Sequence, residues 1–385
     1  MGSPDYDIAI IGGGPVGAAV AVALRDTGLS AVVLEARSRP AASGDARTLA
    51  MSYGSRLILE RLGAWQRLET PTPITSIHVS QRGGFGRTML EAAEAGVPAL
   101  GYVVRYAALQ QAVGAALADT PARLVAATRV TALESAHDRV VVACAGDAGT
   151  ASFTARLAII ADGGGHGLGA PMKAVDYGQA AVVGLVACSR PHGHRAYERF
   201  TPDGPAALLP HGNRYALVWT AAPERARQLL AAGPEQFLQE LQRHFGDRAG
   251  RFESVEARAS FALALRYVED PVLPRAVMLG NAAQALHPIA GQGFNLGLRD
   301  AWELAGILCR REVSDPGAPA VLARYAGARR ADRMHGIALT HSLVRIFSSD
   351  AAPLRALRGA ALSLLDTSPR AKRTFMQAMM FGASG

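Results

Sequence analysis

A glycine-rich fingerprint near the start of the chain constrains the fold more than any other feature. The apolar residues 7–11 predict a buried strand of a parallel sheet, and Gly12-x-Gly14-x-x-Gly17 follows at once. Such glycines permit a tight turn, a close approach of the backbone to a pyrophosphate, and packing of a helix, expected over residues 15–27. A second strand, residues 31–34, delivers Glu35, eighteen positions after Gly17, where a carboxylate can bind a ribose. The pattern predicts a dinucleotide-binding α/β domain and does not distinguish FAD from NAD.

A second glycine-rich segment, residues 277–305, predicts another ligand-binding loop. The apolar residues 276–279 predict a buried strand that ends at Gly280, and a loop rich in Gly, Pro and His follows. Gly291 and Gly293 then open a segment with helical periodicity, so backbone N–H groups and the positive end of the helix dipole face the same ligand. We expect an electron-rich group at this loop.

Length and composition set the broad class of the protein. A chain of 385 residues with 49% hydrophobic content can form two or three globular domains. The net charge of +8 comes almost entirely from arginines, and no basic stripe interleaved with aromatic residues is present, so we expect no nucleic-acid partner. An anionic membrane surface is a partner for which the charge has the right sign.

The cysteines and the apolar segments indicate a cytoplasmic chain. Cys144, Cys188 and Cys309 are odd in number and lack CxxC spacing, so neither a disulfide framework nor a metal site is expected. The uncharged residues 8–24 are short for a membrane span, contain a Gly-Gly-Gly-Pro turn and follow acidic residues, which argues against a span and against a signal peptide.

The second loop carries a resemblance to a known family. The sequence Gly280-Asn281-Ala282-Ala283-Gln284, followed by Leu286-His287-Pro288-x-Ala290-Gly291-Gln292-Gly293-x-Asn295-Leu296-Gly297, resembles the third flavin motif of the single-component (class A) aromatic hydroxylases. The usual motif is Gly-Asp-Ala-Ala-His. Asn281 and Gln284 depart from it in a way that resembles the ubiquinone-biosynthesis branch, the 2-polyprenyl-6-methoxyphenol hydroxylases. Asp162-Gly163 resembles the second motif of the same family.

The resemblance implies an α/β fold with an FAD-binding, Rossmann-like domain of the para-hydroxybenzoate-hydroxylase type. A β-sheet substrate domain and a C-terminal helical segment complete the expected architecture. The FAD-binding domain would be discontinuous, comprising residues 1–72, 98–174 and 272–330. Residues 73–97 and 175–271 would form the substrate domain, and residues 331–385 the C-terminal helices, which would lie on a membrane, on a partner or on their own FAD domain.

The resemblance also assigns residues to the cofactor. In this family an arginine at the position of Arg47 approaches the FAD diphosphate, and Arg105 would be a cofactor-side residue or a salt-bridged arginine at a helix start. The full expected cofactor set is Gly12, Gly14, Gly17, Glu35, Arg37, Arg47, Arg105, Asp162, Gly163, Gly280, Asn281, Gly291, Gln292, Gly293 and Asn295.

The chemistry that the resemblance implies is hydroxylation of a phenol by NAD(P)H and O2 through a C4a-hydroperoxyflavin. Loss of the phenolic proton activates the ring, so a base or a hydrogen-bond relay is expected. His287 is the candidate base, although a histidine before a proline is also a common structural hydrogen-bond partner, and Pro288 would shape the oxygen-binding face. Phe200, Trp219 and Phe261 either line a pocket for a prenylated ring or belong to the ordinary core.

Three functions stay open at the level of sequence. The first is hydroxylation of a prenylated methoxyphenol in ubiquinone biosynthesis, with the chain peripheral on the inner face of the membrane or bound to other ubiquinone-biosynthesis proteins. The second is hydroxylation of a small soluble aromatic, which predicts a closed polar pocket with a carboxylate-binding arginine. The third is a flavin-bearing structural subunit of a lipid-quinone assembly. Prenyl length, the ring position oxidised, NADH or NADPH use and oligomeric state do not follow from the sequence.

Overall fold

The first sheet of the computed structural model carries the predicted dinucleotide fingerprint. The structure describes residues 3–38, 47–146, 149–164, 167–347 and 352–383. The central strands are parallel, and the strands of the sheet in spatial order are β17 (Val272–Leu273), β18 (Ala276–Met278), β11 (Gly149–Ile160), β1 (Tyr6–Ile11), β2 (Ala31–Leu34) and β8 (Arg123–Val125). Strands β9 (Thr128–Ser135) and β10 (Val140–Gly146) pair antiparallel beside β11.

The two faces of this sheet are covered differently. On one face, Ile8 and Ile10 pack in a core with α1 (Pro15–Ala23), α3 (Tyr106–Ala118) and α6 (Gln292–Leu308). On the other face, Ala9 and Ile11 pack against residues of β9 and β10. The first half of the long strand β11 extends outward to pair with β10, so β9, β10 and this half form a small antiparallel layer.

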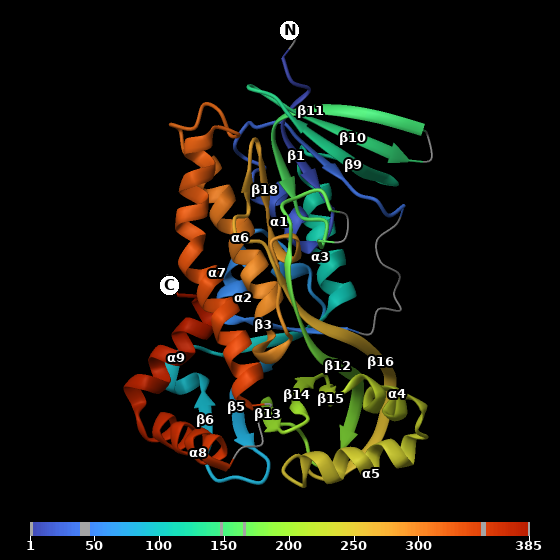
Figure 1. Ribbon diagram of the computed structural model, residues 1–385, viewed down its shortest axis with the longest axis vertical. Coiled ribbons are helices and arrows are strands. Elements are labelled where there is room, and N and C mark those ends of the chain that lie inside the picture. The colour runs from blue at the N-terminus through green and yellow to red at the C-terminus, as the bar shows by residue number, and fades with distance from the viewer. Residues whose placement is uncertain (1–2, 39–46, 147–148, 165–166, 348–351, 384–385) are drawn as a thin grey trace.

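A second sheet lies beyond the first, and two long strands join the two (Figure 1). Its spatial order is β19 (Gln284–Ala285), β16 (Phe252–Tyr267), β12 (Lys173–Cys188), β15 (Arg214–Ala221), β14 (Gly204–His211), β13 (Arg195–Thr201), β5 (Ser76–Gln81) and β6 (Arg87–Glu91). Helices α4 (Pro223–Ala231) and α5 (Pro234–Phe245) cover one face. The excursion predicted at residues 73–97 therefore joins the same sheet as residues 175–271, while the domain boundaries themselves stay a prediction.

A small sheet connects the two larger ones. It has the order β3 (Thr48–Ser52), β7 (Gly101–Arg105) and β4 (Thr72–Ile74), and α2 (Tyr53–Arg61) follows β3 directly. The Ser52 hydroxyl accepts a hydrogen bond from the Ser55 backbone N–H at 3.2 Å and so caps α2.

The C-terminal helices fold back onto their own chain. After α7 (Pro319–Phe347), α8 (Ala352–Thr367) packs on β6, and α9 (Pro369–Phe381) packs on α2 (Figure 1). The Lys372 ammonium lies 2.9 Å from Glu94, and the Asp366 carboxylate accepts from the Met89 N–H at 2.9 Å. None of the described helices combines the length and the apolar character needed to cross a bilayer.

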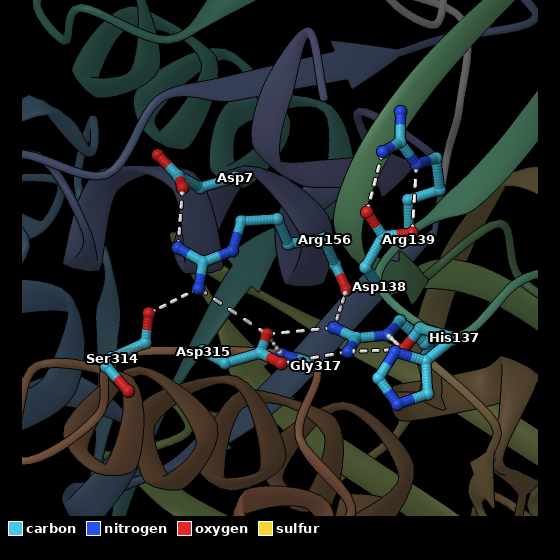
Figure 2. A network of polar contacts seen from close by, with 9 residues as sticks. Asp7, His137, Asp138, Arg139, Arg156, Ser314, Asp315 and Gly317 are labelled. Atoms are coloured by element: carbon cyan, nitrogen blue, oxygen red, sulfur yellow. Dashed lines mark hydrogen bonds and ion pairs between the residues drawn. The ribbon is translucent and has the colours of Figure 1, made fainter. Parts of the chain in front are cut away.

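An ion-pair network fastens the amino-terminal edge of the first sheet. Arg156 of β11 bridges Asp7 of β1 at 3.2 Å and the carbonyl of Ser314, which lies between α6 and α7 (Figure 2). Arg275 binds both carboxylate oxygens of Asp315 at 2.8 and 2.9 Å. Because this network holds the amino end of β1, the opposite, carboxyl ends of the parallel strands remain available for a ligand, as in other open α/β sheets.

Candidate active site

A cavity of about 1080 Å³ begins at the carboxyl end of β1 and continues to α8. Its first half is lined by the two glycine-rich loops that the sequence singles out. Its second half lies under the second sheet and is also lined by side chains of α7, α8 and α9. The same space therefore joins a polar, glycine-lined end to an apolar end.

The three glycines of the fingerprint have different tasks. Gly12 has φ of +104°, and a Cβ there would lie 2.5 Å from the carbonyl oxygen of Ala161. A Cβ on Gly17 would lie 2.0 Å from the carbonyl oxygen of Gly12, so this glycine permits packing and does not itself line the cavity. Gly14 lines the cavity and has no atom within 4 Å of its would-be Cβ. That open space fits the diphosphate of a dinucleotide.

Glu35 is held at the end of β2 by its neighbours. Its carboxylate accepts from the Gly13 N–H at 2.8 Å and from the Arg37 Nε at 2.8 Å. Burial alone would raise the pKa of Glu35, but the hydrogen bonds and charge of Arg37 lower it below its usual value. An ionised carboxylate fixed beside the glycine turn can accept further hydrogen bonds from ribose hydroxyls.

The second glycine-rich loop meets the first across the cavity. Gly280 and Gly291 have φ of +57° and +61°, and Gly291 precedes the first turn of α6. Asn281, Gln292 and Gly293 also line the cavity, as predicted residues of this loop. The amino end of α6 therefore faces the space where a flavin ring system would complete the dinucleotide.

The Asn295 side chain holds α6 against its neighbours through hydrogen bonds. Its Oδ1 accepts from the Ser52 N–H at 2.9 Å and from the Ser55 hydroxyl at 2.7 Å, and its Nδ2 donates to the Ala50 carbonyl at 3.1 Å. Each of these bonds joins α6 to β3 or α2. Asn295 borders the cavity but is 1% exposed, so we assign it to positioning the loop.

The remaining predicted cofactor residues divide into two groups. Arg37, Arg47, Asp162 and Gly163 line the cavity, and the Arg47 guanidinium lies 4.5 Å from the centre of the Tyr106 ring. Asp162 accepts from the Gly164 N–H at 2.9 Å. Arg105 is exposed at the start of α3 and lies outside the cavity lining, so the structure does not place it with the other predicted cofactor residues.

We predict that Gly14→Ala lowers FAD affinity about 100-fold or more and leaves the melting temperature of the apoprotein unchanged. The added methyl group meets no protein atom but occupies the space of the diphosphate. Equilibrium titration of apoprotein with FAD measures the affinity. Gly114→Ala, in an open position of α3, is the matched control and should bind FAD normally. Normal FAD affinity in Gly14→Ala would place the diphosphate elsewhere.

The structure does not support His287 as the candidate base. It is 1% exposed and does not line the cavity, since its ring packs edge-on against Tyr177 with 5.6 Å between ring centres. Burial lowers the pKa of His287 to about 4, and its Nδ1 accepts from the Ile289 N–H at 3.3 Å. The structure thus favours the turn-stabilising alternative. Pro288 does line the cavity, so its effect on the oxygen-binding face stays a prediction.

The three aromatic candidates for the substrate pocket separate in the structure. Phe200 lines the cavity and stacks on Phe347 with 3.6 Å between ring centres. For Trp219 the structure favours the core alternative, because alternate residues of a strand face opposite sides of the sheet. Its neighbour Val218 lines the cavity, while Trp219 packs against Phe237 of α5. Phe261 fits neither the pocket nor the core alternative, since it is 42% exposed and lies outside the lining.

Glu198 of β13 is a cavity residue that the sequence analysis missed. It faces the same side as Phe200, two residues later, and burial raises its pKa to about 7. Glu198 is the one carboxylate among the described residues that line the apolar half. Its signal was the alternation Ala196, Glu198, Phe200, in which a charged residue occupies an inward position of the strand.

The far end of the cavity opens between α7 and α8. Leu354 and Leu357 line the cavity and are nevertheless 38% and 65% exposed, and Ile346 is 43% exposed. Together they form an apolar rim. Arg358 also borders this end, but its Nη1 donates to the Ile346 carbonyl at 2.7 Å.

The chain is similar to flavoproteins in both sequence and structure. The family described as FAD binding domain matches residues 5–337. A ubiquinone hydroxylase of Rhodospirillum rubrum is 38% identical over 97% of this chain and 89% of its own length. The 3-demethoxyubiquinol 3-hydroxylase of Escherichia coli is 32% identical over 97% of this chain and 98% of its own. The crystal structure of p-nitrophenol 4-monooxygenase from Pseudomonas putida shares the fold, with a TM-score of 0.78 at 19% identity over 98% and 97% of the two chains.

Proposed function

Because this chain belongs to the FAD-binding-domain family and is an FAD-dependent aromatic hydroxylase, we propose that it hydroxylates a polyprenylated methoxyphenol in ubiquinone biosynthesis. NAD(P)H and O2 would be the co-substrates. The observation that carries the choice of substrate is the apolar half of the cavity, which runs from the glycine loops to an exposed apolar rim on α8.

The residues of the polar half fit FAD. Gly12 and Gly14 would let the diphosphate approach the backbone, Glu35 would accept from the adenosine ribose, and the amino end of α6 would face the flavin ring. When bound, FAD supplies hydride acceptance from NAD(P)H and the activation of dioxygen. The protein's own part is to hold the phenol beside the flavin and to keep water away from the reacting atoms.

Glu198 is proposed as the base that receives the phenolic proton. A free phenol has a pKa near 10, so a partner is needed to share its proton at neutral pH. A carboxylate with a pKa of about 7 matches that task and projects into the apolar half from the sheet above it.

The prenyl tail is proposed to leave the cavity between α7 and α8. A small soluble aromatic acid would call for an arginine free to bind its carboxylate, whereas the Arg358 guanidinium already donates to a backbone carbonyl. An exposed rim of Leu354, Leu357 and Ile346 instead matches a chain that continues into a bilayer. We therefore propose peripheral docking of this rim on an anionic membrane surface, which the net positive charge would assist.

The test of this function compares two classes of phenol. FAD-loaded protein is given NADH or NADPH with a short-chain prenyl methoxyphenol and, separately, with hydroxybenzoates. Reduced-nucleotide oxidation and oxygen uptake are followed, and products are identified by mass. We expect a hydroxylated prenylphenol with matched nucleotide consumption. Turnover of the soluble acids alone would overturn the substrate assignment, and silence with both classes would favour the flavin-bearing structural subunit.

We predict that Leu357→Glu raises the KM for a prenylated phenol about 10-fold or more, because a charge at the rim opposes passage of the apolar tail. The KM for the same phenol without its tail should not change. Leu364→Glu is the matched control, since Leu364 is 70% exposed on the same helix and does not line the cavity. Equal effects of both variants on KM would argue against an opening at Leu357.

A further inference from the structure

A second group of buried polar side chains lies on the opposite face of the second sheet, away from the flavin cavity. Arg199 of β13 has its Nε and Nη1 buried with no hydrogen-bond partner among the described residues. His244, near the end of α5, is 6% exposed, and its Nε2 is likewise unpartnered. Buried donors without partners are uncommon and costly in folded proteins, so they point to a missing ligand.

His244 of this group lines a pocket of about 500 Å³, and Arg199 lies outside the lining. Arg82, Arg225 and His244 are among its lining residues. Two carboxylates also line it, Asp203 and Glu240, but Glu240 is already bound to Arg225 at 2.6 Å and to Arg243 at 3.0 Å. The pocket therefore carries more positive than negative charge.

The electrostatics of the group are consistently positive. Burial lowers the pKa of Arg199, and the charges of Arg248 and Arg82 lower it further. The pKa of His244 falls to about 3, through burial first and then through the charges of Arg82, Arg199 and Arg225. Like charges held together in a partly buried site favour the binding of an anion that neutralises them.

We propose that this pocket is a phosphate-binding site, in which Arg82 and His244 bind a phosphate group carried by a second ligand, while Arg199, outside the lining, adds positive charge beside it. Arginine and neutral histidine N–H groups donate to phosphate oxygens, and a phosphate dianion would balance the surplus positive charge. Phosphate could arrive on a soluble nucleotide or on a lipid headgroup, and the chemistry at the protein is the same.

The position of the pocket favours the nucleotide. Tyr177 lines it, and the Tyr177 ring packs on His287 at 5.6 Å between ring centres. His287 and Pro288 belong to the glycine-rich loop, and Pro288 lines the flavin cavity. Tyr177 therefore lies between the proposed phosphate site and the loop that borders the cofactor space.

The test measures melting of the FAD-loaded protein in inorganic phosphate and in sodium chloride of equal ionic strength. We expect saturating phosphate to raise the melting temperature by about 5 °C more than chloride does. Arg199→Met should abolish that difference. Without phosphate, Arg199→Met should melt at or above the temperature of the parent protein, because it removes a buried unpaired charge.

The matched control is Arg227→Met, which removes the same charge from an exposed position on α4. It should keep the full phosphate effect. An equal response of the parent protein to phosphate and chloride would overturn the site. A large loss of stability in Arg199→Met without phosphate would also overturn it, because Arg199 would then have a structural partner.

Two further arms identify the source of the phosphate. If the nucleotide carries it, Arg199→Met should raise the KM for NADPH about 10-fold or more and leave the KM for NADH unchanged. If a lipid carries it, the same variant should lose binding to vesicles that contain phosphatidic acid, with both nucleotide KM values unchanged. If Arg199→Met keeps its phosphate response and loses neither NADPH affinity nor vesicle binding, the proposal is refuted.

Discussion

Glu198→Gln is expected to lower kcat with a prenylated phenol about 100-fold or more, with little change in FAD affinity. Removal of a general base typically costs 10²- to about 10⁴-fold in rate. In the parent protein kcat should rise with pH through an inflection near 7, the pKa to which burial raises the Glu198 carboxyl. Single-turnover hydroxylation across pH 5–9 measures both effects, and the variant should lose the inflection near 7.

Glu198→Gln should also change how the stability of the protein depends on pH. Burial raises the pKa of folded Glu198 from its ordinary 4.5 to about 7, so the folded state holds the proton more tightly than the unfolded state. The parent protein must therefore lose stability as pH rises from about 4.5 to 7. Glu198→Gln removes this loss, so its melting temperature should exceed that of the parent at pH 8 and match it at pH 4.5. A variant with unchanged kcat would exclude Glu198 as the base.

The glycine-rich loops were predictable because backbone geometry alone demands their residues. At Gly12 a side chain would meet the Ala161 carbonyl, and at Gly291 the φ of +61° favours glycine. A local pattern therefore reports a local constraint. The same reasoning located the strand that follows the first loop, whose predicted residues 31–34 match β2.

The parts of the site that depend on long-range pairing were not predictable. Whether Trp219 or Val218 faces the cavity depends on the register of β15 between β12 and β14, and a shift of one residue reverses every side chain. The alternation around Glu198 indicates an inward position, but the cavity that it enters depends on the pairing of β13 with β5, more than a hundred residues earlier in the chain. The sequence around each residue carries no record of those partners.

Gln284 shows how a departure from a family motif can be structural. It is fully buried and does not line the cavity. Its Nε2 donates to the Asp300 carboxylate at 2.5 Å, and its Oε1 accepts from the Arg333 Nε at 2.8 Å. Asp300 in turn binds the Arg329 Nε at 2.8 Å. The resulting network joins the loop after β18 to α6 and α7.

The charges in this network depend on one another. Burial alone would lower the pKa of Arg329, but the carboxylates of Asp300 and Asp332 raise it above its usual value. The Arg329 Nη2 lies 2.7 Å from Asp332, and Asp332 also binds the Arg299 Nε at 2.8 Å. Removing a single carboxylate from such a set leaves a buried guanidinium without compensation.

Asp300→Ala is therefore expected to cost roughly 3–5 kcal/mol of unfolding free energy, and to lower the melting temperature by on the order of 10 °C. Asp300 is fully buried and is the acceptor that Arg329 and Gln284 share. Denaturant unfolding followed by circular dichroism measures the loss. FAD affinity should fall as well, since the Gly280 N–H points to the same carboxylate at 3.4 Å. Asp300→Leu combined with Arg329→Met removes both charges and should recover much of the stability. If the double variant were less stable than Asp300→Ala, the cost would lie in packing at α6 and not in the unpaired charge.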